Sequence, residues 1–265
     1  MESNNQASPQ KYVFITGAAA GIGRATALLF AKRGWFVGIA GRDARKLETL
    51  QKEIGEDRCS WHVIDVTDPA SVASALEAFS AISNQRLDVL VNNAGLLKAG
   101  HFEDISLDDH HQIVETNFKG VLNCSHAAFP LLKNTPGARV INMSSASAMY
   151  GAPSLSSYSA SKFAVRALTE ALNVEWDRHD ITVSDVMPPF VDTGMLHQTA
   201  RGKIKAISYL GVNLTPKDVA KRVWHTAHAN ELHVQVGLPF RLMALGQKHA
   251  PGRLQKRMVK FLSGY

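Results

Sequence analysis

The chain of 265 residues has only two cysteines, Cys59 and Cys124, and neither lies in a CxxC pair. So few cysteines cannot build a disulfide framework, and their scarcity suits a reducing compartment. No run of about 18 apolar residues occurs, which speaks against a membrane-spanning helix. The first ten residues, MESNNQASPQ, lack the basic and apolar regions of a secretory signal. We therefore expect a cytoplasmic protein without a membrane span, and a disordered tail over residues 1–10.

The sequence also lacks internal repeats, low-complexity tracts and any linker rich in proline, glycine or serine. Hydrophobic residues make up 45% of the chain and charged residues 20%, as in an ordinary globular protein. The net charge of +6 is spread along the chain except at its C-terminal end, and no nucleic-acid-binding motif accompanies it. The 11 histidines form no metal-ligand pattern. We therefore expect a single domain that binds neither nucleic acid nor a metal ion.

Apolar stretches rich in β-branched and aromatic residues alternate with segments of helical spacing. Strands are predicted at 12–16, 35–40, 60–65, 87–92, 138–144, 181–186 and 232–236. Helices are predicted at 22–33, 43–54, 69–83, 106–133, 157–178 and 215–229. Because parallel strands need a crossover between them, this alternation predicts an α/β fold. The expected architecture is a doubly wound, Rossmann-like parallel sheet with helices on both faces.

The first predicted strand runs into the sequence TGAAAGIG at residues 16–23. In a doubly wound sheet this turn lies where a dinucleotide pyrophosphate can rest on the N-terminus of the following helix. Gly17, Gly21 and Gly23 suit that position because they allow tight backbone geometry and close approach. A purely structural turn can have the same appearance, so the glycines alone leave both interpretations open.

Tyr158 and Lys162 lie four residues apart in a predicted helix, so their side chains emerge on one face. A free phenol has a pKa near about 10, which is too high for acid–base work near neutral pH. We expect the neighbouring ammonium to favour the phenolate and to lower the pKa of Tyr158. Such a tyrosine could exchange a proton with a substrate oxygen.

Five motifs occur together and in one order: TGAAAGIG, NNAG at 92–95, Asn117, a serine in NMSS and YSASK at 158–162. From about residue 11 to about residue 237 the chain thereby resembles the short-chain dehydrogenase/reductase family. The resemblance implies an oxidoreductase that interconverts a ketone or aldehyde and an alcohol by hydride transfer.

The resemblance also implies the catalytic residues. Tyr158 would be the acid/base, and Ser145 would hydrogen-bond the substrate oxygen. Lys162 would hold the nicotinamide ribose in addition to acting on Tyr158. Asn117 would bend its helix and anchor a water that connects Lys162 to solvent.

The cofactor site implied by the resemblance lies at the carboxyl ends of the strands. One of its members, Asp65, would hold the adenine amino group, and a turn carboxylate in DVTDP is the alternative. The implied contacts are Gly17, Ala20, Gly21, Ile22, Gly23, Arg42, Asp65, Val66, Asn93, Ala94, Gly95, Tyr158, Lys162, Pro188, Val191 and Thr193.

The end of the second strand distinguishes the two nicotinamide dinucleotides. A carboxylate there would accept hydrogen bonds from the ribose 2′-hydroxyl of NAD(H), but the sequence has Gly41 followed by Arg42. A guanidinium can bind a 2′-phosphate, so NADP(H) is favoured and NAD(H) is the alternative. Two residues weaken this prediction: Ala20 replaces a second basic residue that is frequent in the family, and Asp43 follows Arg42 directly.

Three segments depart from the family pattern or vary within it. Pro189 replaces the glycine usual after the sixth strand, which predicts a stiffer loop. The stretch from 194 to about 214 would cover the substrate, and its apolar residues could clasp a lipid-like compound or form ordinary amphipathic packing. The basic amphipathic extension 239–265 could meet an anionic membrane surface or an acidic partner, or be a solvated face.

We therefore expect an NADP(H)-dependent carbonyl reductase acting on a medium-sized, largely apolar carbonyl or alcohol substrate, within a domain over 11–238. The alternatives are an NAD-dependent alcohol or hydroxysteroid-type dehydrogenase and a non-catalytic dinucleotide-binding sensor or scaffold. The family resemblance further implies a homodimer or homotetramer, with the helices around 106–133 and 157–178 as the dimer face.

Overall fold

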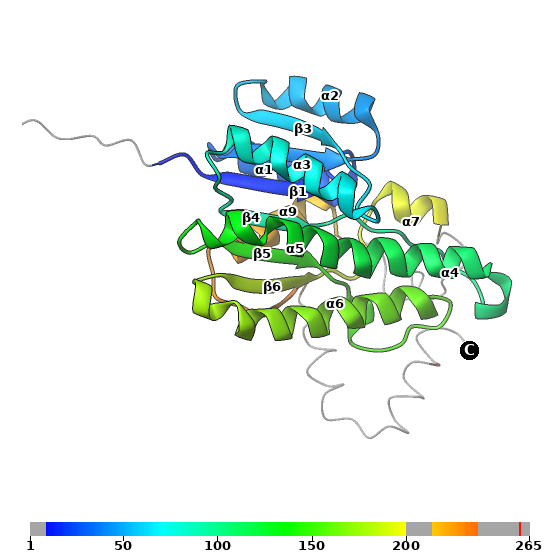
Figure 1. The fold of residues 1–265 in the computed structure, drawn as a ribbon. Helices are drawn as coiled ribbons and strands as arrows, with labels where there is room; N and C mark the ends of the chain where they lie inside the picture. The colour runs from blue at the N-terminus through cyan, green and yellow to red at the C-terminus, as the bar shows by residue number, and fades with distance from the viewer. Residues whose placement is uncertain (1–8, 200–213, 238–259, 261–265) are drawn as a thin grey trace, which may run out of the picture.

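A computed structural model describes residues 9–199, 214–237 and 260 (Figure 1). Its centre is a seven-stranded sheet in the order β3-β2-β1-β4-β5-β6-β7, and all neighbouring strands are parallel. The strands are β1 (Tyr12–Thr16), β2 (Phe36–Gly41), β3 (Cys59–Val63), β4 (Val89–Asn92), β5 (Arg139–Met143), β6 (Thr182–Met187) and β7 (His233–Gln235).

The strand order reverses direction at β1, which is the arrangement of a doubly wound, Rossmann-like sheet. The predicted fold class is therefore confirmed. The helices are α1 (Gly21–Lys32), α2 (Ala44–Ile54), α3 (Pro69–Ile82), α4 (Leu107–Val114), α5 (Gly120–Lys133), α6 (Ser156–Glu175), α7 (Gly194–Thr199) and α9 (Pro216–Thr226).

Helices cover both faces of the sheet because successive side chains of each strand point to opposite sides. In β1, Val13 and Ile15 pack in one core with α1, α2 and α9. Phe14, between them, packs in a second core with α3 and α5. Figure 1 shows α3, α5 and α6 together in front of the sheet. Both cores are apolar, which explains why the strands read as nearly continuous hydrophobic runs.

The four central strands end at the same edge of the sheet because they are parallel. β1 ends at Thr16, β4 at Asn92, β5 at Met143 and β6 at Met187. Most predicted site residues lie in the segments that follow these strands, whereas Arg42 and Asp65 follow β2 and β3. The fold thus brings residues from distant parts of the sequence to one edge.

The helix starts predicted from sequence are confirmed at two positions. Asp68 caps α3 by accepting a hydrogen bond from the Ala70 amide. Thr215 caps α9 in a reciprocal capping box with Asp218. The predicted helix 106–133 is interrupted: a π-helical turn over Glu115–Lys119 separates α4 from α5.

Parts of two predicted segments fall outside the described residues. Of the tail over 1–10, residues 1–8 lie outside, and the side chain of Gln10 donates a hydrogen bond to the carbonyl of Gly34 at 3.1 Å. Of the basic extension 239–265, the structure describes Lys260. Within the described part of the chain, no helix is long and apolar enough to cross a membrane.

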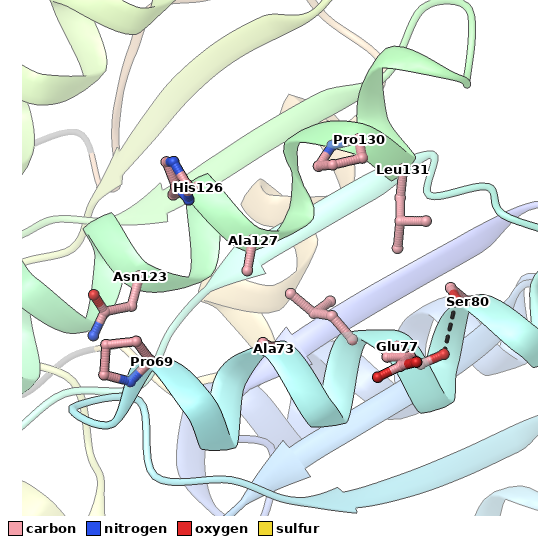
Figure 2. Close-up of a pocket in the computed structure, with 10 residues that line it drawn as sticks. Pro69, Ala73, Glu77, Ser80, Asn123, His126, Ala127, Pro130 and Leu131 are labelled. Atoms are coloured by element: carbon pink, nitrogen blue, oxygen red, sulfur yellow. Dashed lines mark hydrogen bonds between the residues drawn. The ribbon is translucent and has the colours of Figure 1, made fainter.

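A groove of about 600 Å³ lies between α3 and α5 (Figure 2). Small side chains face each other across it, notably Ala73 and Ala127, and Pro69 and Pro130 lie near its two ends. Its lining includes none of the residues predicted to bind cofactor or substrate. The groove is therefore separate from the candidate active site.

Candidate active site

The glycine turn after β1 has the backbone geometry that only glycine adopts without strain. Gly17 has φ +65° and Gly21 has φ +54°. A Cβ added to Gly23 would lie 2.4 Å from the carbonyl oxygen of Gly17, so the helix start approaches the turn too closely for a side chain. Ala20 is the N-cap of α1 and has no side chain that could cap the helix amides. Such a cradle fits the pyrophosphate of a dinucleotide.

The segment after β4 is tied to this turn by side-chain hydrogen bonds. The Asn93 amide group donates to the carbonyl oxygens of Thr16 at 2.9 Å and Gly17 at 3.2 Å. The Thr16 hydroxyl accepts from the backbone amides of Asn93 and Ala94, both at 3.0 Å. Asn93 and Ala94 therefore hold the two loops together, beside the place where an adenosine ribose is expected.

The ends of β2 and β3 form the rim of the turn. Gly41 is buried, and a Cβ added there would meet its nearest atoms only at 3.8 Å. Arg42 is exposed. Asp43 caps α2 and forms an ion pair with Lys46 at 3.0 Å, so its carboxylate is engaged within the helix. The rim thus has space at Gly41 and an exposed guanidinium, Arg42, beside the place where the adenosine ribose of a dinucleotide is expected.

Asp65 lies two residues beyond the end of β3. Its carboxylate accepts hydrogen bonds from the amide and hydroxyl of Thr67 at 3.0 and 2.8 Å. These bonds lower the pKa of Asp65 below its ordinary value, and the charge of Arg42 adds a smaller effect. Val66 beside it is buried against Gly120. Asp65 thus has the geometry of a turn carboxylate, and its contact with adenine stays a prediction.

Three of the predicted catalytic side chains, Ser145, Tyr158 and Lys162, come together just after the end of β5 and in the first turns of α6. Ser145 is the N-cap of a short 3-10 turn, η3 (Ala146–Ala148), and its side chain lies near enough to Tyr158 to lower the pKa of the phenol through a hydrogen bond. The Lys162 ammonium lies 5.7 Å from the centre of the Tyr158 ring and donates to the Met143 carbonyl at 2.7 Å. A hydroxyl, a phenol and an ammonium therefore share one small region, the arrangement needed for proton exchange with a bound oxygen.

The pKa values at this centre differ from the expectation drawn from sequence. Burial raises the pKa of the Tyr158 phenol above its ordinary value, and the hydrogen bond with Ser145 only partly offsets this. Burial also lowers the pKa of Lys162 to about 8. The expected lowering of the pKa of Tyr158 is therefore wrong for this structure, because removal from water disfavours both charged forms.

Asn117 lies at the centre of the π-helical turn between α4 and α5 and is fully buried. Its amide exchanges two hydrogen bonds with the backbone of Leu96, at 2.7 and 2.9 Å, and donates to the Ser161 hydroxyl at 3.1 Å. A Cβ added to Gly95 would lie 3.3 Å from Asn117 Oδ1. Asn117 thus connects the helix bend to the segment after β4 and to α6.

The segment after β6 returns to the glycine turn. The carbonyl of Pro188 accepts a hydrogen bond from Ala146 at 3.0 Å, next to Ser145. Val191 is buried and pairs with Leu214 in an isolated parallel bridge. The Thr193 side chain would be 3.5 Å from a Cβ on Gly21. Of the predicted substrate-covering stretch, the part over 200–213 lies outside the described residues.

An apolar wall packs around the Tyr158 ring, and most of its members were not identified from the sequence. The wall packs together residues from the loops after β4 and β6, the loop before α6, and α7. Its members besides Tyr158 are Leu97, Ala99, Ala152, Leu155, Phe190 and Leu196. They lie in the segments that follow β4 and β6 or just before YSASK, and this placement is the signal that could have identified them. The wall favours an apolar group beside the reacting oxygen.

Two curated relatives match the chain over most of their length. Sulfoacetaldehyde reductase 2 of Chromohalobacter salexigens is 34% identical over 234 residues, which cover 84% of this chain and 92% of the relative. A 3-oxoacyl-(acyl-carrier-protein) reductase of Thermotoga maritima is 33% identical over 230 residues, with coverages of 84% and 93%.

Solved structures show the same likeness. A 3-ketoacyl-(acyl-carrier-protein) reductase from Brucella melitensis, complexed with NADH, superposes with a TM-score of 0.77 at 28% identity, covering 85% of this chain and 96% of that one. An alcohol dehydrogenase from Thermococcus sibiricus, complexed with 5-hydroxy-NADP, gives 0.76 at 26% identity, with coverages of 86% and 96%.

The model of the short chain dehydrogenase family matches residues 11–203 of this chain. That segment contains the glycine turn and all four predicted catalytic residues. Family members among the solved structures are complexed with NADH or with an NADP derivative. The chain therefore belongs to the short-chain dehydrogenases, and is an oxidoreductase of carbonyl and alcohol groups that uses a nicotinamide dinucleotide.

Proposed function

We propose that this chain is an NADP(H)-dependent reductase of medium-sized, largely apolar ketones or aldehydes, acting reversibly on the corresponding alcohols. The observation that carries the proposal is the meeting of Ser145, Tyr158 and Lys162 inside an apolar wall, next to the glycine turn. The names of both curated relatives describe carbonyl reductases, which supports the same reaction class.

Each polar group of the proposed centre has a separate task. The Tyr158 hydroxyl gives its proton to the carbonyl oxygen in reduction and takes it back in oxidation. Ser145, whose side chain lies beside the Tyr158 phenol, stabilises the negative charge that develops on that oxygen. Lys162 stabilises the phenolate left on Tyr158. When bound, the nicotinamide supplies or accepts the hydride.

Burial suits these groups to the task even though it raises the pKa of Tyr158. A neutral phenol is the form that donates a proton, so the raised pKa keeps Tyr158 protonated for reduction. Lys162 is 4% exposed, which strengthens its interaction with any phenolate that forms. We therefore propose that the buried pair is set for carbonyl reduction near neutral pH.

The preference for NADP(H) rests on Arg42, and we expect Arg42→Ala to bind NADPH about 10- to 100-fold more weakly. A hydrogen bond to a charged group contributes about 1.5–3 kcal/mol, and Arg42 is the exposed guanidinium at the open rim beside Gly41. Fluorescence titration with NADPH and, separately, NADH measures both affinities without a known substrate. The affinity for NADH is expected to stay unchanged.

Arg33→Ala is the matched control, because Arg33 lies at the C-terminal end of α1, away from the glycine turn at its N-terminus, and stacks on Trp224. It should bind both dinucleotides as the wild type does. A wild-type protein that binds NADH more tightly than NADPH would instead favour an NAD-dependent dehydrogenase.

We further propose a homo-oligomer whose interface is formed by α5 and α6. These helices expose apolar side chains on their outer surface: Leu122, Phe163 and Val174, the last of which is 76% exposed. Phe163→Glu is expected to reduce the mass measured by light scattering to that of one chain, 28.9 kDa.

Ile82→Glu is the control for this substitution, since Ile82 is an equally exposed apolar residue at the end of α3. It should leave the mass unchanged. A wild-type mass of one chain would contradict the proposed oligomer. A cytoplasmic location remains a prediction from the sequence.

A further inference from the structure

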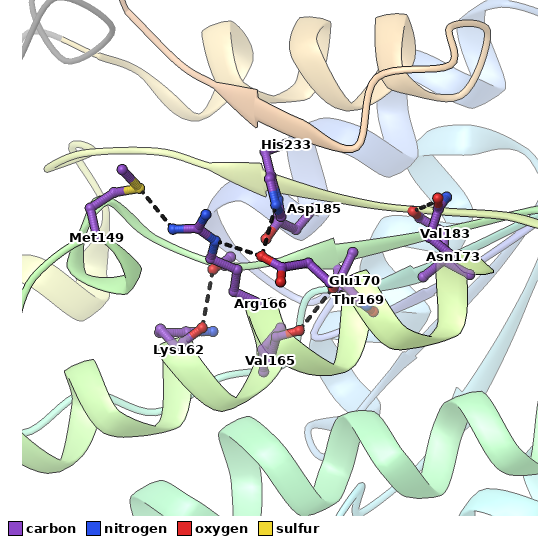
Figure 3. A network of polar contacts seen from close by, with 12 residues as sticks. Met149, Lys162, Val165, Arg166, Thr169, Glu170, Asn173, Val183, Asp185 and His233 are labelled. Carbon is purple, nitrogen blue, oxygen red and sulfur yellow. Dashed lines mark hydrogen bonds and ion pairs between the residues drawn. The ribbon is translucent and has the colours of Figure 1, made fainter. Parts of the chain in front are cut away.

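A network of polar side chains runs from β6, next to the edge strand β7, to the turn that carries Ser145 (Figure 3). It begins at Asp185 in β6, whose carboxylate contacts His233 of β7 at 3.0 Å. The other ring nitrogen of His233 contacts Glu170 of α6 at 3.0 Å. Glu170 accepts from Arg166 at 3.1 Å, and Arg166 donates to the sulfur of Met149 at 3.2 Å.

The first pair of this network joins a buried carboxylate, Asp185, to a half-buried imidazole, His233. Asp185 is fully buried in the middle of β6, and its Oδ2 has no hydrogen-bond partner in the described part of the chain. Burial raises the pKa of Asp185, and the hydrogen bond with Asp185 raises the pKa of His233. Both shifts favour a proton held between the two residues, which gives Glu170 a cationic or hydrogen-bonding partner.

The network continues the catalytic side of α6. Tyr158, Lys162, Arg166 and Glu170 follow at intervals of four residues, so each is the neighbour of the next along the helix. Glu170 receives Arg166 from one direction and His233 from the other, and both contacts fall on the same oxygen, Oε1. Arg166 is thereby held one helical turn beyond Lys162.

The far end of the network reaches the catalytic serine through one short turn. Ser145 is the N-cap of η3 and Met149 is its C-cap. Within the turn, the Ala148 amide donates to the Ser145 carbonyl at 2.9 Å and the Ser147 amide to the Ser145 hydroxyl at 3.1 Å. A displacement of Met149 would therefore be transmitted to the Ser145 side chain.

We propose that Arg166 is a positioning residue: held by Glu170 and the His233–Asp185 pair, it fixes the end of η3 opposite to Ser145 and so keeps the Ser145 hydroxyl on the Tyr158 phenol. The proposal rests on the proposed function for its effect on turnover, but its geometric claim can be tested without a substrate. It assigns a role to four residues that do not contact the reacting atoms.

The test is an NMR measurement of the Tyr158 ring in protein labelled with ¹³Cζ-tyrosine, because the ¹³Cζ shift responds to hydrogen bonding of the phenol. Tyr158→Phe identifies the signal, and Ser145→Ala gives its position when the serine hydroxyl is absent. Arg166→Met is expected to move the signal in the direction that Ser145→Ala moves it. An unmoved signal in a folded Arg166→Met protein would overturn the proposal.

Two further variants keep the test decisive if Arg166→Met does not fold. Met149→Leu preserves the volume but removes the sulfur acceptor, so the same displacement is expected at smaller size. Asp185→Asn is expected to move the signal in the same direction, and no movement would remove the His233–Asp185 pair from the proposal. Glu175→Gln is the control, an exposed carboxylate at the end of α6, and should leave the signal in place.

Kinetics separate this proposal from the proposed function. With a carbonyl substrate that the wild type reduces, Arg166→Met should lower kcat about tenfold while leaving the NADPH dissociation constant unchanged, because a small displacement of a catalytic group slows the chemical step. If the wild type reduces no carbonyl compound, the proposed function fails, whereas the NMR comparison still decides whether Arg166 positions Ser145.

Discussion

Tyr158→Phe is expected to lower turnover about a thousandfold while leaving dinucleotide affinity within about twofold, since general acid–base catalysis contributes about 10²–10⁴-fold. The substitution removes one oxygen and keeps the ring, which packs against the apolar wall that includes Leu155 and Phe190. The shape of the site is thus preserved, and the lost group is the proton donor itself. The measurement is kcat for carbonyl reduction, together with NADPH binding by fluorescence.

Tyr150→Phe is the matched control for this prediction. Tyr150 is a second tyrosine close to the site in sequence, and burial raises the pKa of its phenol as it does for Tyr158. Its phenylalanine variant should retain most of the activity. Full turnover by Tyr158→Phe would remove Tyr158 from the mechanism. Tight cofactor binding by a wild type without turnover would favour the sensor or scaffold.

Lys162→Met is expected to make the protein more stable by about 1–2 kcal/mol at pH 7 and to lower turnover at least about a hundredfold. Lys162 is 4% exposed, and burial lowers its pKa from 10.5 to about 8. A cation with that shift is disfavoured in the folded state by about 3 kcal/mol. The hydrogen bond from Lys162 to the Met143 carbonyl, which the variant loses, offsets part of this gain.

The stability difference between Lys162→Met and the wild type should depend on pH in one direction. Between pH 8 and 10.5 the unfolded chain binds the Lys162 proton and the folded chain releases it, so wild-type stability gains from this group as the pH rises. The advantage of Lys162→Met should therefore be full below pH 8 and disappear towards pH 10.5. Urea unfolding of both proteins at several pH values measures it. A variant that is less stable than the wild type at pH 7 would show that Lys162 is not a buried, destabilised cation.

The sequence alone was sufficient for the fold class, and it named most of the residues that the structure brings together at the candidate site. Strand and helix alternation predicts the doubly wound sheet because parallel strands require crossovers. The glycine turn can be recognised from the sequence because the positive φ at Gly17 and the close approach at Gly23 both require glycine. The spacing of Tyr158 and Lys162 is equally local, since a helix places residues four apart on one side.

Other features depend on contacts between distant segments, and the sequence did not reveal them. The family resemblance implied a helix bend at Asn117, but not its form, a π-helical turn where the Asn117 side chain bonds the backbone of Leu96, 21 residues away. The apolar wall around Tyr158 collects residues from four separate segments. The direction of the Tyr158 pKa was wrongly predicted because a neighbouring charge is visible in sequence and burial is not.

The network of Asp185, His233, Glu170 and Arg166 is likewise a feature that depends on tertiary structure and could not be predicted from the sequence. Asp185 and His233 are 48 residues apart in the chain and become neighbours only because β6 and β7 pair in register. Local patterns determined which segments are strands, helices and turns, because those preferences act over a few residues. Tertiary structure determined which side chains lose water and which charges meet, because burial and pairing depend on how distant segments pack.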